Sequence, residues 1–222
     1  MDTATPLYIY LLDLVGTFVF ALTGGFRAIK YECNILGMLV LSTAVGVGGG
    51  MTRDMLLGIT PPMALRNMDY LAVTITAGLF VFFYSRRIAL SWQWVMYFDA
   101  VGLAVFSAVG AEKAFNAGLG PVSIMCIAAV ASAGGGVIRD VLTGELPCVF
   151  TGELYATAAC AGGGIFWLAM QLGLSDKIGF IVVFSSVITI RFIGMKWNIK
   201  LPRAKKLAAS PSTLIRHYRG KE

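Results

Sequence analysis

The residues of this chain that could do chemistry are two matching sets of charged side chains. In each set an aspartate is followed forty residues later by an Arg-Asp pair; the sets are Asp13 with Arg53 and Asp54, and Asp99 with Arg139 and Asp140. These groups could attract and gate cations along a charged pathway, or they could pair into clusters that hold helices together. Both interpretations are open for all six residues. Neighbours on a helix point about 100° apart, so we expect each arginine to pair with another helix, not with its own aspartate.

A run of three glycines precedes each Arg-Asp pair. The two runs are Gly48, Gly49, Gly50 and Gly134, Gly135, Gly136. Each glycine inside a helix costs up to about 1 kcal/mol relative to alanine, so the runs predict a kink or an unwound turn. Backbone carbonyls freed at membrane depth must be buried in protein or line a watery cavity, where they suit a desolvated monovalent cation. We therefore expect transient K⁺ or Na⁺ contact at both kinks, no permanently bound metal and no cofactor.

The composition of the chain indicates that membrane helices position these groups. Of 222 residues, 57% are hydrophobic and only 14% are charged, and the mean hydropathy is +0.76. A soluble domain has about 25% charged residues, so this chain has too few for a surface in water. The one histidine, His217, lies in the terminal tail, and no Walker lysine or G-x-S-x-G motif occurs. We expect an integral membrane protein that is not an enzyme and does not bind nucleic acid.

Seven stretches approach the roughly 20 apolar residues that cross a bilayer. They are Leu7–Arg27, Ile35–Leu57, Asp69–Tyr84, Trp92–Ala111, Val122–Leu142, Leu154–Leu172 and Ile178–Lys196. The predicted fold is an all-α membrane protein whose residues 1–222 form a single membrane domain. Within it we expect a three-helix repeat at 7–84, a second at 92–172, a seventh helix at 178–197 and a basic tail at 198–222.

The distribution of lysine and arginine predicts the direction of insertion. With the N-terminus outside, thirteen basic residues fall on the inner side of the membrane and four on the outer side, which is the bias of the positive-inside rule. We expect a multi-pass protein of the cell (inner) membrane with its C-terminus in the cytoplasm. The basic tail, which dominates this bias, is interpreted either as an anchor or as a site for lipid headgroups. Membrane lipids are therefore expected partners.

The two three-helix units are copies of one sequence. An offset of 86 residues aligns both glycine runs, both Arg-Asp pairs and both aspartates without a gap. Chance similarity between apolar helices would repeat Leu and Val, not Gly, Asp, Arg and Pro in register. Because a unit of three crossings is odd, the second copy enters the membrane from the opposite side. The result is an inverted repeat, a common plan in transporters, with the site at the interface between the copies.

The motif G-G-G-x-x-R-D, found at Gly48–Asp54 and Gly134–Asp140, resembles that of the bacterial branch of the trimeric intracellular cation (TRIC) channel family. The resemblance covers about Leu7 to Trp197, and the family has also carried a "glycine transporter" domain label. It implies a homotrimer in which each protomer has its own pore. That pore would run between the two repeats, past kinked second and fifth helices, and would pass monovalent cations, mainly K⁺.

Two other interpretations are open. A secondary transporter of a small solute such as glycine suits inverted repeats and broken helices equally well. A membrane scaffold without a pathway is disfavoured by the duplicated intramembrane aspartates and glycines. For the oligomer, the second and fifth spans carry more small residues than one narrow pore requires, which suggests contacts between protomers. These residues include Ala44, Gly46, Ala131, Ser132 and Ala133.

Overall fold

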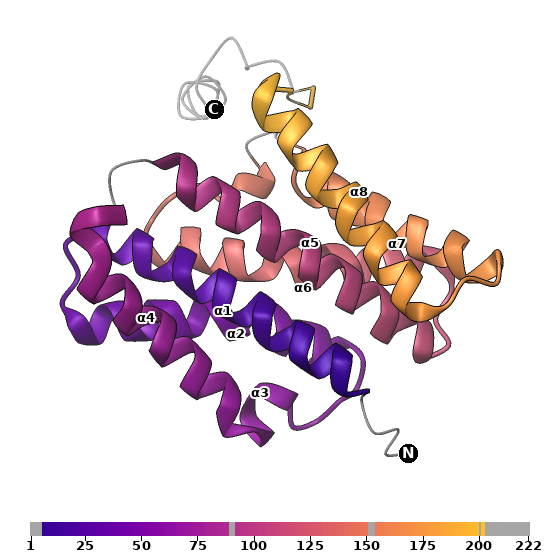
Figure 1. Cartoon of the computed structure of the whole chain (residues 1–222), viewed down its shortest axis with the longest axis horizontal. Coiled ribbons are helices and arrows are strands. Elements are labelled where there is room, and N and C mark those ends of the chain that lie inside the picture. Colours follow the sequence, from indigo (N-terminus) through magenta and orange to yellow (C-terminus); the bar gives the residue numbers. More distant parts are fainter. Residues whose placement is uncertain (1–5, 89–91, 151–153, 200, 203–222) are drawn as a thin grey trace, which may run out of the picture.

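The computed structural model describes residues 6–88, 92–150, 154–199 and 201–202, and the regular elements in these ranges are helices (Figure 1). The long helices are α1 (Leu7–Lys30), α2 (Ile35–Leu56), α4 (Met68–Ile88), α5 (Trp92–Asn116), α6 (Pro121–Leu142), α7 (Ala156–Gln171) and α8 (Asp176–Lys196). Two short elements join them, α3 (Met63–Arg66) and the 3₁₀ turn η1 (Cys148–Phe150). The tail predicted over 198–222 lies almost wholly outside the described residues.

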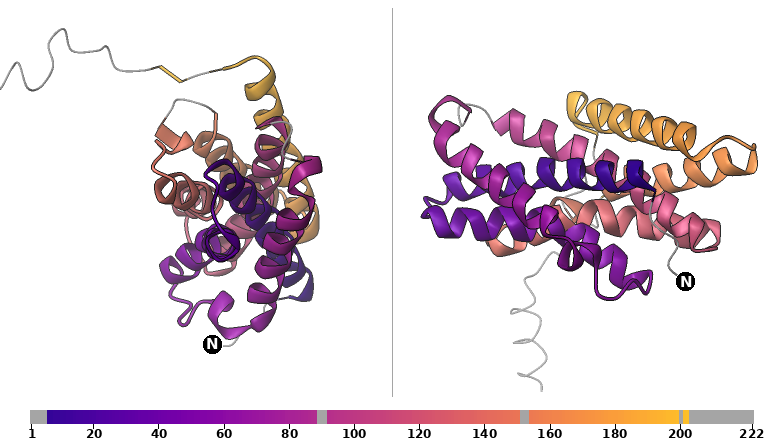
Figure 2. Two further views of the ribbon diagram at one scale, coloured as in Figure 1. Left: turned by 90° about the vertical axis from the view of Figure 1, so that its left-hand side faces the viewer. Right: turned by 60° about the horizontal axis from the view of Figure 1, so that its bottom comes forward.

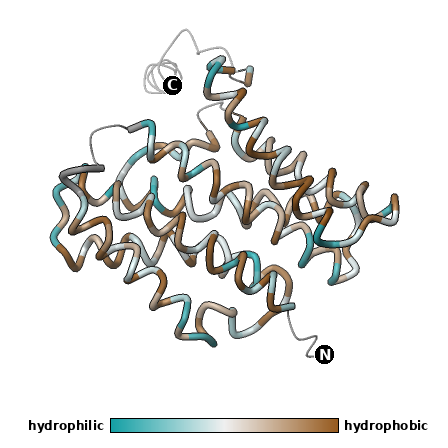
Figure 3. Tube along the Cα trace, viewed as in Figure 1, coloured by the Kyte–Doolittle hydropathy of each residue, from teal (hydrophilic) through white to brown (hydrophobic). Residues whose placement is uncertain are grey.

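Each long helix corresponds to one of the seven predicted spans. Within the described residues, α1, α2, α5, α6 and α8 are long and apolar enough to cross a membrane, and Figure 3 shows hydrophobic residues along these helices. The apolar part of α4, Met68–Tyr84, is shorter, and α7 has 16 residues. The prediction of an all-α membrane protein is confirmed, and the count of seven crossings stays a prediction.

Local sequence explains where helices begin and end. The side chain of Asn34 accepts a hydrogen bond of 2.8 Å from the backbone N–H of Gly37 and caps the start of α2. Pro121 is the first residue of α6, a position where a missing N–H costs nothing. Gly58 and Gly144, 86 residues apart, follow α2 and α6 with φ of +72° and +69°. This left-handed conformation favours glycine and ends both helices in the same way.

Helices α1 and α5 extend further than the sequence predicts, as does α4, which continues past Tyr84 to Ile88. Helix α1 continues past Arg27 to Lys30, and α5 continues past Ala111 to Asn116. A charge suggests the end of a membrane span when only the sequence is considered. Here the side chains of Arg27 and Lys113 are buried in ion pairs with carboxylates, so the helices pass through them without exposing a lone charge to lipid.

The long helices in the described ranges form two groups of three and one addition. Helices α1, α2 and α4 contact one another, and so do α5, α6 and α7. The groups meet chiefly where α1 packs on α5 and where α2 packs on α6, so each of these helices meets its counterpart in the other copy. Helix α8 packs on α5 and α7, and the α1–α5 pair separates it from α4 (Figures 1 and 2).

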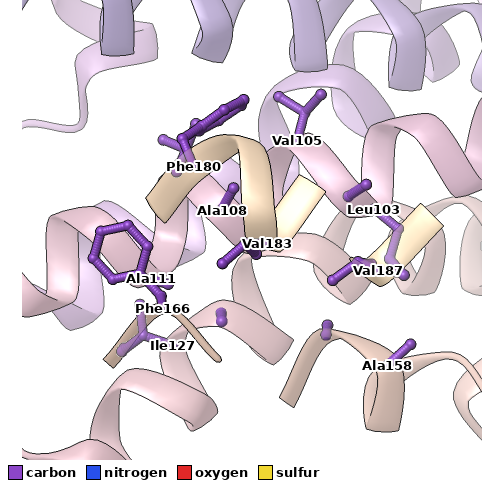
Figure 4. Close-up of a cluster of buried hydrophobic side chains, with 14 of the residues drawn as sticks. Leu103, Val105, Ala108, Ala111, Ile127, Ala158, Phe166, Phe180, Val183 and Val187 are labelled. Atoms are coloured by element: carbon purple, nitrogen blue, oxygen red, sulfur yellow. The ribbon is translucent and has the colours of Figure 1, made fainter. Parts of the chain in front are cut away.

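The core consists of two clusters of apolar side chains. One fills the space among α5, α6, α7 and α8, where Leu103, Phe166 and Val183 are completely buried (Figure 4). The other lies among α1, α2, α4 and α5 and includes Phe20 and Val45. Lipid is as apolar as these side chains, so close packing, not transfer out of water, stabilises the helix contacts.

Candidate ion pathway between the two repeats

The middle glycine of each run lies where α2 and α6 cross. A Cβ atom on Gly49 would lie 2.2 Å from the carbonyl oxygen of Ala131, and one on Gly135 would lie 2.6 Å from the carbonyl oxygen of Val45. Ala131 and Val45 are 86 residues apart, so the contact is reciprocal. Val45 meets Gly135, and Gly49, four residues later on α2, meets Ala131, four residues earlier on α6. The two helices therefore run antiparallel at the crossing. Any side chain at either glycine would force the two backbones apart.

The glycine runs do not unwind their helices. Helix α2 is continuous over Ile35–Leu56 and α6 over Pro121–Leu142. The expected unwound turn is therefore wrong: the glycines allow a close approach of two backbones, and helical hydrogen bonding continues through them. A kink without unwinding stays a prediction. Contact of K⁺ or Na⁺ with the runs also stays a prediction, without the support that freed carbonyls would have given.

The outer glycines of the runs face other neighbours. A Cβ on Gly48 would lie 2.3 Å from Cδ1 of Ile138, and one on Gly136 would lie 2.5 Å from the hydroxyl oxygen of Tyr155. Gly50 has more room, since its Cβ would lie 3.4 Å from the nearest ring atom of Phe106. In each run the first two glycines thus face the opposite helix of the crossing, and the third faces another part of the chain.

The first charge cluster surrounds Arg53 near the end of α2. Its Nη1 and Nη2 donate to the two carboxylate oxygens of Asp13 at 2.9 Å each, and its Nε donates to Asp54 at 2.9 Å. The hydroxyl of Tyr70 on α4 donates to Asp13 at 3.0 Å. Lys113, from the end of α5, lies 3.4 Å from Asp13 and 3.5 Å from Asp54. Two carboxylates and two cations balance one another in a buried site.

The second charge cluster repeats this arrangement around Arg139 on α6. Its Nη1 donates to Asp99 at 2.6 Å, and its Nε donates to Asp140 at 2.9 Å. The hydroxyl of Tyr155 donates to Asp99 at 3.3 Å. Arg27, from the end of α1, donates to Asp140 at 3.0 Å. Again two carboxylates meet two cations, and all four charged side chains are buried.

Each cluster therefore takes one cation from the other repeat. Arg27 and Lys113 are 86 residues apart and occupy corresponding places on α1 and α5. Arg27 joins the second cluster and Lys113 joins the first. Neither residue was a predicted site residue, because Arg and Lys do not match as identical letters. The offset of 86 residues also aligns Ala28 with Ala114, and a basic residue directly before each of these alanines is the signal that could have found the pair.

The structure brings the six predicted charged residues together within their own sets. Asp13, Arg53 and Asp54 meet in the first cluster, and Asp99, Arg139 and Asp140 meet in the second. The expected pairing of each arginine with another helix is confirmed, but the expectation that it does not pair with its own aspartate is wrong. Each guanidinium donates from Nε to the aspartate that follows it and from Nη1 to the aspartate of another helix.

The second carboxylate oxygen of each Arg-Asp pair holds the loop that follows the helix. Asp54 accepts a hydrogen bond of 3.1 Å from the backbone N–H of Met63, the first residue of α3. Asp140 accepts one of 3.1 Å from the N–H of Cys148, the first residue of η1. These short elements, which the hydropathy pattern does not indicate, thus close over the charge clusters.

Apolar contacts separate the two clusters. The rings of Phe20 and Phe106, which are repeat counterparts, stack with their centroids 5.4 Å apart. The guanidinium carbon of Arg53 lies 5.9 Å from the centroid of Phe106. The recess beside the first cluster, walled by Asp13, Gly50 and other residues of α1 to α4, has no space for a water molecule. In this conformation the recess beside the first cluster is closed to water.

Glu145 extends the second cluster into the loop after α6. Its carboxylate accepts hydrogen bonds from Arg27 at 2.6 Å and from Lys30 and Tyr31 at 2.5 Å each. Burial alone would raise the pKa of Glu145, but the hydrogen bonds from Lys30 and Tyr31 and the charge of Arg27 lower it to about 2. The carboxylate therefore stays charged throughout the neutral range and pairs with three donors.

Replacing Glu145 with glutamine should remove a pH-dependent part of the stability. Because the pKa falls from 4.5 to about 2 on folding, the contribution is present above pH 4.5 and is lost as the pH falls toward 2. The side chain is 29% exposed, so we expect a loss of about 1 kcal/mol at neutral pH. Thermal unfolding in detergent from pH 7 to 3 measures it, and Glu32→Gln is the control. Equal acid sensitivity of wild type and Glu145→Gln would contradict the assignment.

A family model described as "Glycine transporter" matches residues 10–86 and again residues 96–171, at the same offset as the internal repeat. A solved TRIC orthologue from Rhodobacter sphaeroides is 32% identical, covers 86% of this chain and 99% of its own, and superposes with a TM-score of 0.83. The chain belongs to the bacterial TRIC channel family. A solved prokaryotic TRIC channel is 34% identical, with 87% and 98% covered and a TM-score of 0.81.

Curated bacterial relatives agree with this family. The inner membrane protein YadS of Escherichia coli K12 is 36% identical over 87% of this chain and 95% of its own length. A membrane protein of Vibrio cholerae is 35% identical over 91% and 86%. The TRIC resemblance seen in the sequence is confirmed, and this chain is a membrane protein whose solved relatives are TRIC channels.

Proposed function

We propose that this TRIC family member is a channel for monovalent cations, mainly K⁺, with its pathway between the two repeats and past the α2–α6 crossing. The observation that carries the proposal is the pair of buried, charge-balanced clusters, each of which takes a cation from the opposite repeat. When the repeats part, Lys113 leaves Asp13 and Asp54, and Arg27 leaves Asp140. Carboxylates then face the widened interface, where they attract cations and repel anions.

The topology that we propose has seven crossings, with the N-terminus outside and the C-terminus in the cytoplasm. Arg53 and Arg139 follow the crossing glycines by four residues on two antiparallel helices, so they lie on opposite sides of the crossing. In this orientation the first cluster faces the outer end of the pathway and the second faces the inner end. Inverted repeats would give such a two-ended path.

Ion flux from liposomes tests the proposal. Purified protein in vesicles loaded with K⁺ should release it faster than protein-free vesicles, and Cl⁻ release should stay near that of the protein-free vesicles. The double variant Arg53→Gln with Arg139→Gln, reconstituted in the same way, is the matched control. It tests whether the pathway runs through the two clusters. Equal release of K⁺ and Cl⁻, or release that the double variant leaves unchanged, contradicts a cation pathway at this place.

We further propose a homotrimer in which each protomer has its own pore, on the strength of the solved TRIC relatives, one of which is named a trimeric channel. The argument from surplus small residues does not support it. Gly46, Ala131, Ser132 and Ala133 are buried inside the protomer, so they serve packing within one chain, and only Ala44 of the five is half-buried. The helix faces that remain exposed include Leu36 and Val122, at 66% and 71%.

Cross-linking in native membranes tests the oligomer. The expected result is a ladder that ends at three copies and is the same in membranes and in mild detergent. Tryptophan at Leu36 or Val122, tested one at a time, identifies the interface, since a bulky residue there should shift the ladder toward the monomer. A ladder that ends at two, or protein that is monomeric in membranes as well, contradicts the trimer.

A secondary transporter of a small solute such as glycine is the second candidate. The description of the matching family model favours it, and a closed site between two repeats also suits alternating access. Counterflow of labelled glycine into glycine-loaded vesicles distinguishes the two. A channel gives K⁺ flux and no counterflow, whereas a glycine transporter gives counterflow without K⁺ flux.

A further inference from the structure

Helix α8, which lies outside the repeated units, carries a buried charge within its apolar sequence. Arg191 is 3% exposed and stands five residues before the end of the helix. A charged residue within a membrane helix is costly and commonly has a functional role. Neither of the charge clusters includes Arg191, so its contacts need their own explanation.

Arg191 contacts the segment directly before α7. Its Nη1 donates a hydrogen bond of 3.1 Å to the carbonyl oxygen of Leu154. Its guanidinium carbon lies 4.8 Å from the ring centroid of Tyr155, within the range of a cation–π interaction. Gly194, almost one turn further along α8, also faces Leu154, since a Cβ there would lie 3.4 Å from Cβ of Leu154. The end of α8 therefore holds residues 154 and 155 in place.

Tyr155 connects this contact to the proposed pathway. It is 1% exposed, and its hydroxyl donates to Asp99 in the second cluster at 3.3 Å. The same hydroxyl covers the last glycine of the second run, because a Cβ on Gly136 would lie 2.5 Å from it. A contact chain thus leads from Arg191 through Tyr155 to Asp99, and from Asp99 to Arg139.

The first cluster has a similar tyrosine in a different setting. Tyr70 donates to Asp13 as Tyr155 donates to Asp99. The ring of Tyr70 contacts the ring of Tyr10 on α1, with centroids 5.9 Å apart in an edge-to-face arrangement. Helix α8 packs on α5 and α7, on the side of the second repeat. The two clusters are thus alike in their charges and differ in what supports the tyrosine.

We propose that Arg191 is a positioning residue that holds Tyr155 over Gly136 and Asp99 and so keeps the second cluster closed. Through this contact α8 favours the closed state at the end of the pathway that holds the second cluster, and it does not act on the first cluster. The proposal rests on the proposed function, because it assigns Arg191 a role in closing an ion pathway. It also gives the seventh helix a role beyond packing.

Open probability in single-channel recordings tests the proposal. Arg191→Met removes the charge and keeps the length, and Tyr155→Phe keeps the ring and removes the hydroxyl. Each change should raise the open probability about tenfold, the factor that corresponds to a contact of about 1.4 kcal/mol. Because the two residues act in series, the double variant should show little more than either single change. Arg191→Lys, which keeps a cation over the ring, should restore most of the closed state.

The matched control is Tyr70→Phe in the first repeat. Combined with Arg191→Met, its effect on open probability should be additive, because the two act on different clusters. If Arg191 served stability alone, Arg191→Met would lower the melting temperature, and its effect on open probability would combine with Tyr155→Phe in the same way as with Tyr70→Phe. The proposal is overturned if Arg191→Met leaves the open probability unchanged. It is also overturned if the effect of Arg191→Met adds fully to that of Tyr155→Phe, as it should to that of Tyr70→Phe.

Hydrogen exchange separates this proposal from the proposed function. In Arg191→Met the backbone amides of residues 156–160 should exchange about tenfold faster, as expected for loss of a contact of about 1.4 kcal/mol, while those of residues 70–75 stay unchanged. If the wild type conducts no ions but exchange responds in this way, the positioning of Tyr155 stands and the channel function fails. If the wild type conducts and exchange at 156–160 does not respond, the positioning role fails alone.

Discussion

Alanine at Gly49 or Gly135 is expected to destabilise the protein and to raise ion flux, because it forces the two repeats apart, although alanine is the better helix former. A Cβ at these positions would lie 2.2 Å and 2.6 Å from a backbone carbonyl oxygen of the facing helix. Backbone cannot rotate away as a flexible side chain can, so α2 and α6 must separate. Overpacking of this kind costs about 1–3 kcal/mol, and the gain of up to about 1 kcal/mol in helix propensity offsets only part of it.

The run itself contains the matched control for this prediction. Gly50→Ala adds the same methyl group one residue further on, where the nearest ring atom of Phe106 is 3.4 Å away. This variant should melt within a few degrees of the wild type and conduct like it. Thermal unfolding in detergent and flux from vesicles measure both effects. If Gly49→Ala and Gly50→Ala behave alike, the close crossing of α2 and α6 is not what the glycines provide.

Removal of one charge from the first cluster is expected to cost about 3–5 kcal/mol, because the partner is left buried without compensation. Arg53→Gln leaves Asp13 and Asp54 with Lys113 alone, and Asp13→Asn leaves an excess of positive charge. Both should lower the melting temperature. Their effects on ion selectivity should be opposite, since Arg53→Gln leaves the pathway more negative and Asp13→Asn leaves it more positive.

Reversal potentials in a salt gradient measure this difference. The cation-to-anion permeability ratio should rise in Arg53→Gln and fall in Asp13→Asn. Arg139→Gln and Asp99→Asn in the second cluster are the matched pair and should give the same signs if both clusters face the pathway. Loss of stability in all four variants with an unchanged permeability ratio would mean that the clusters only hold the helices together.

Much of this site follows from the repeat in the sequence. Asp13 and Arg53 stand forty residues apart, as do Asp99 and Arg139, and each pair meets in space. The positions of the long helices also follow from hydropathy, because a membrane helix needs a length of apolar sequence that few other elements have. An intramembrane charge that occurs twice in register is a strong signal, since each copy must find a partner.

Other parts of the site depend on tertiary contacts that the sequence does not contain. Tyr70 and Tyr155 are 85 residues apart, not 86, because the loop before α7 differs by one residue, so an alignment without gaps misses them. The glycine runs predict unwinding when only the helix is considered. The close approach of a second backbone, at Ala131 and Val45, gives the glycines a different purpose, and nothing local indicates which backbone that is.

Single-channel recording of the wild-type protein in a planar bilayer tests the central claim most directly. With K⁺ at different concentrations on the two sides, we predict resolvable unitary steps that reverse near the K⁺ equilibrium potential, since alternating access moves too few ions per cycle to give such steps. Protein prepared in the same way with Asp13→Asn should give steps whose reversal potential lies further from the K⁺ equilibrium potential, which excludes a contaminating channel. A bilayer without unitary steps, from a preparation that catalyses glycine counterflow in vesicles, would contradict the account.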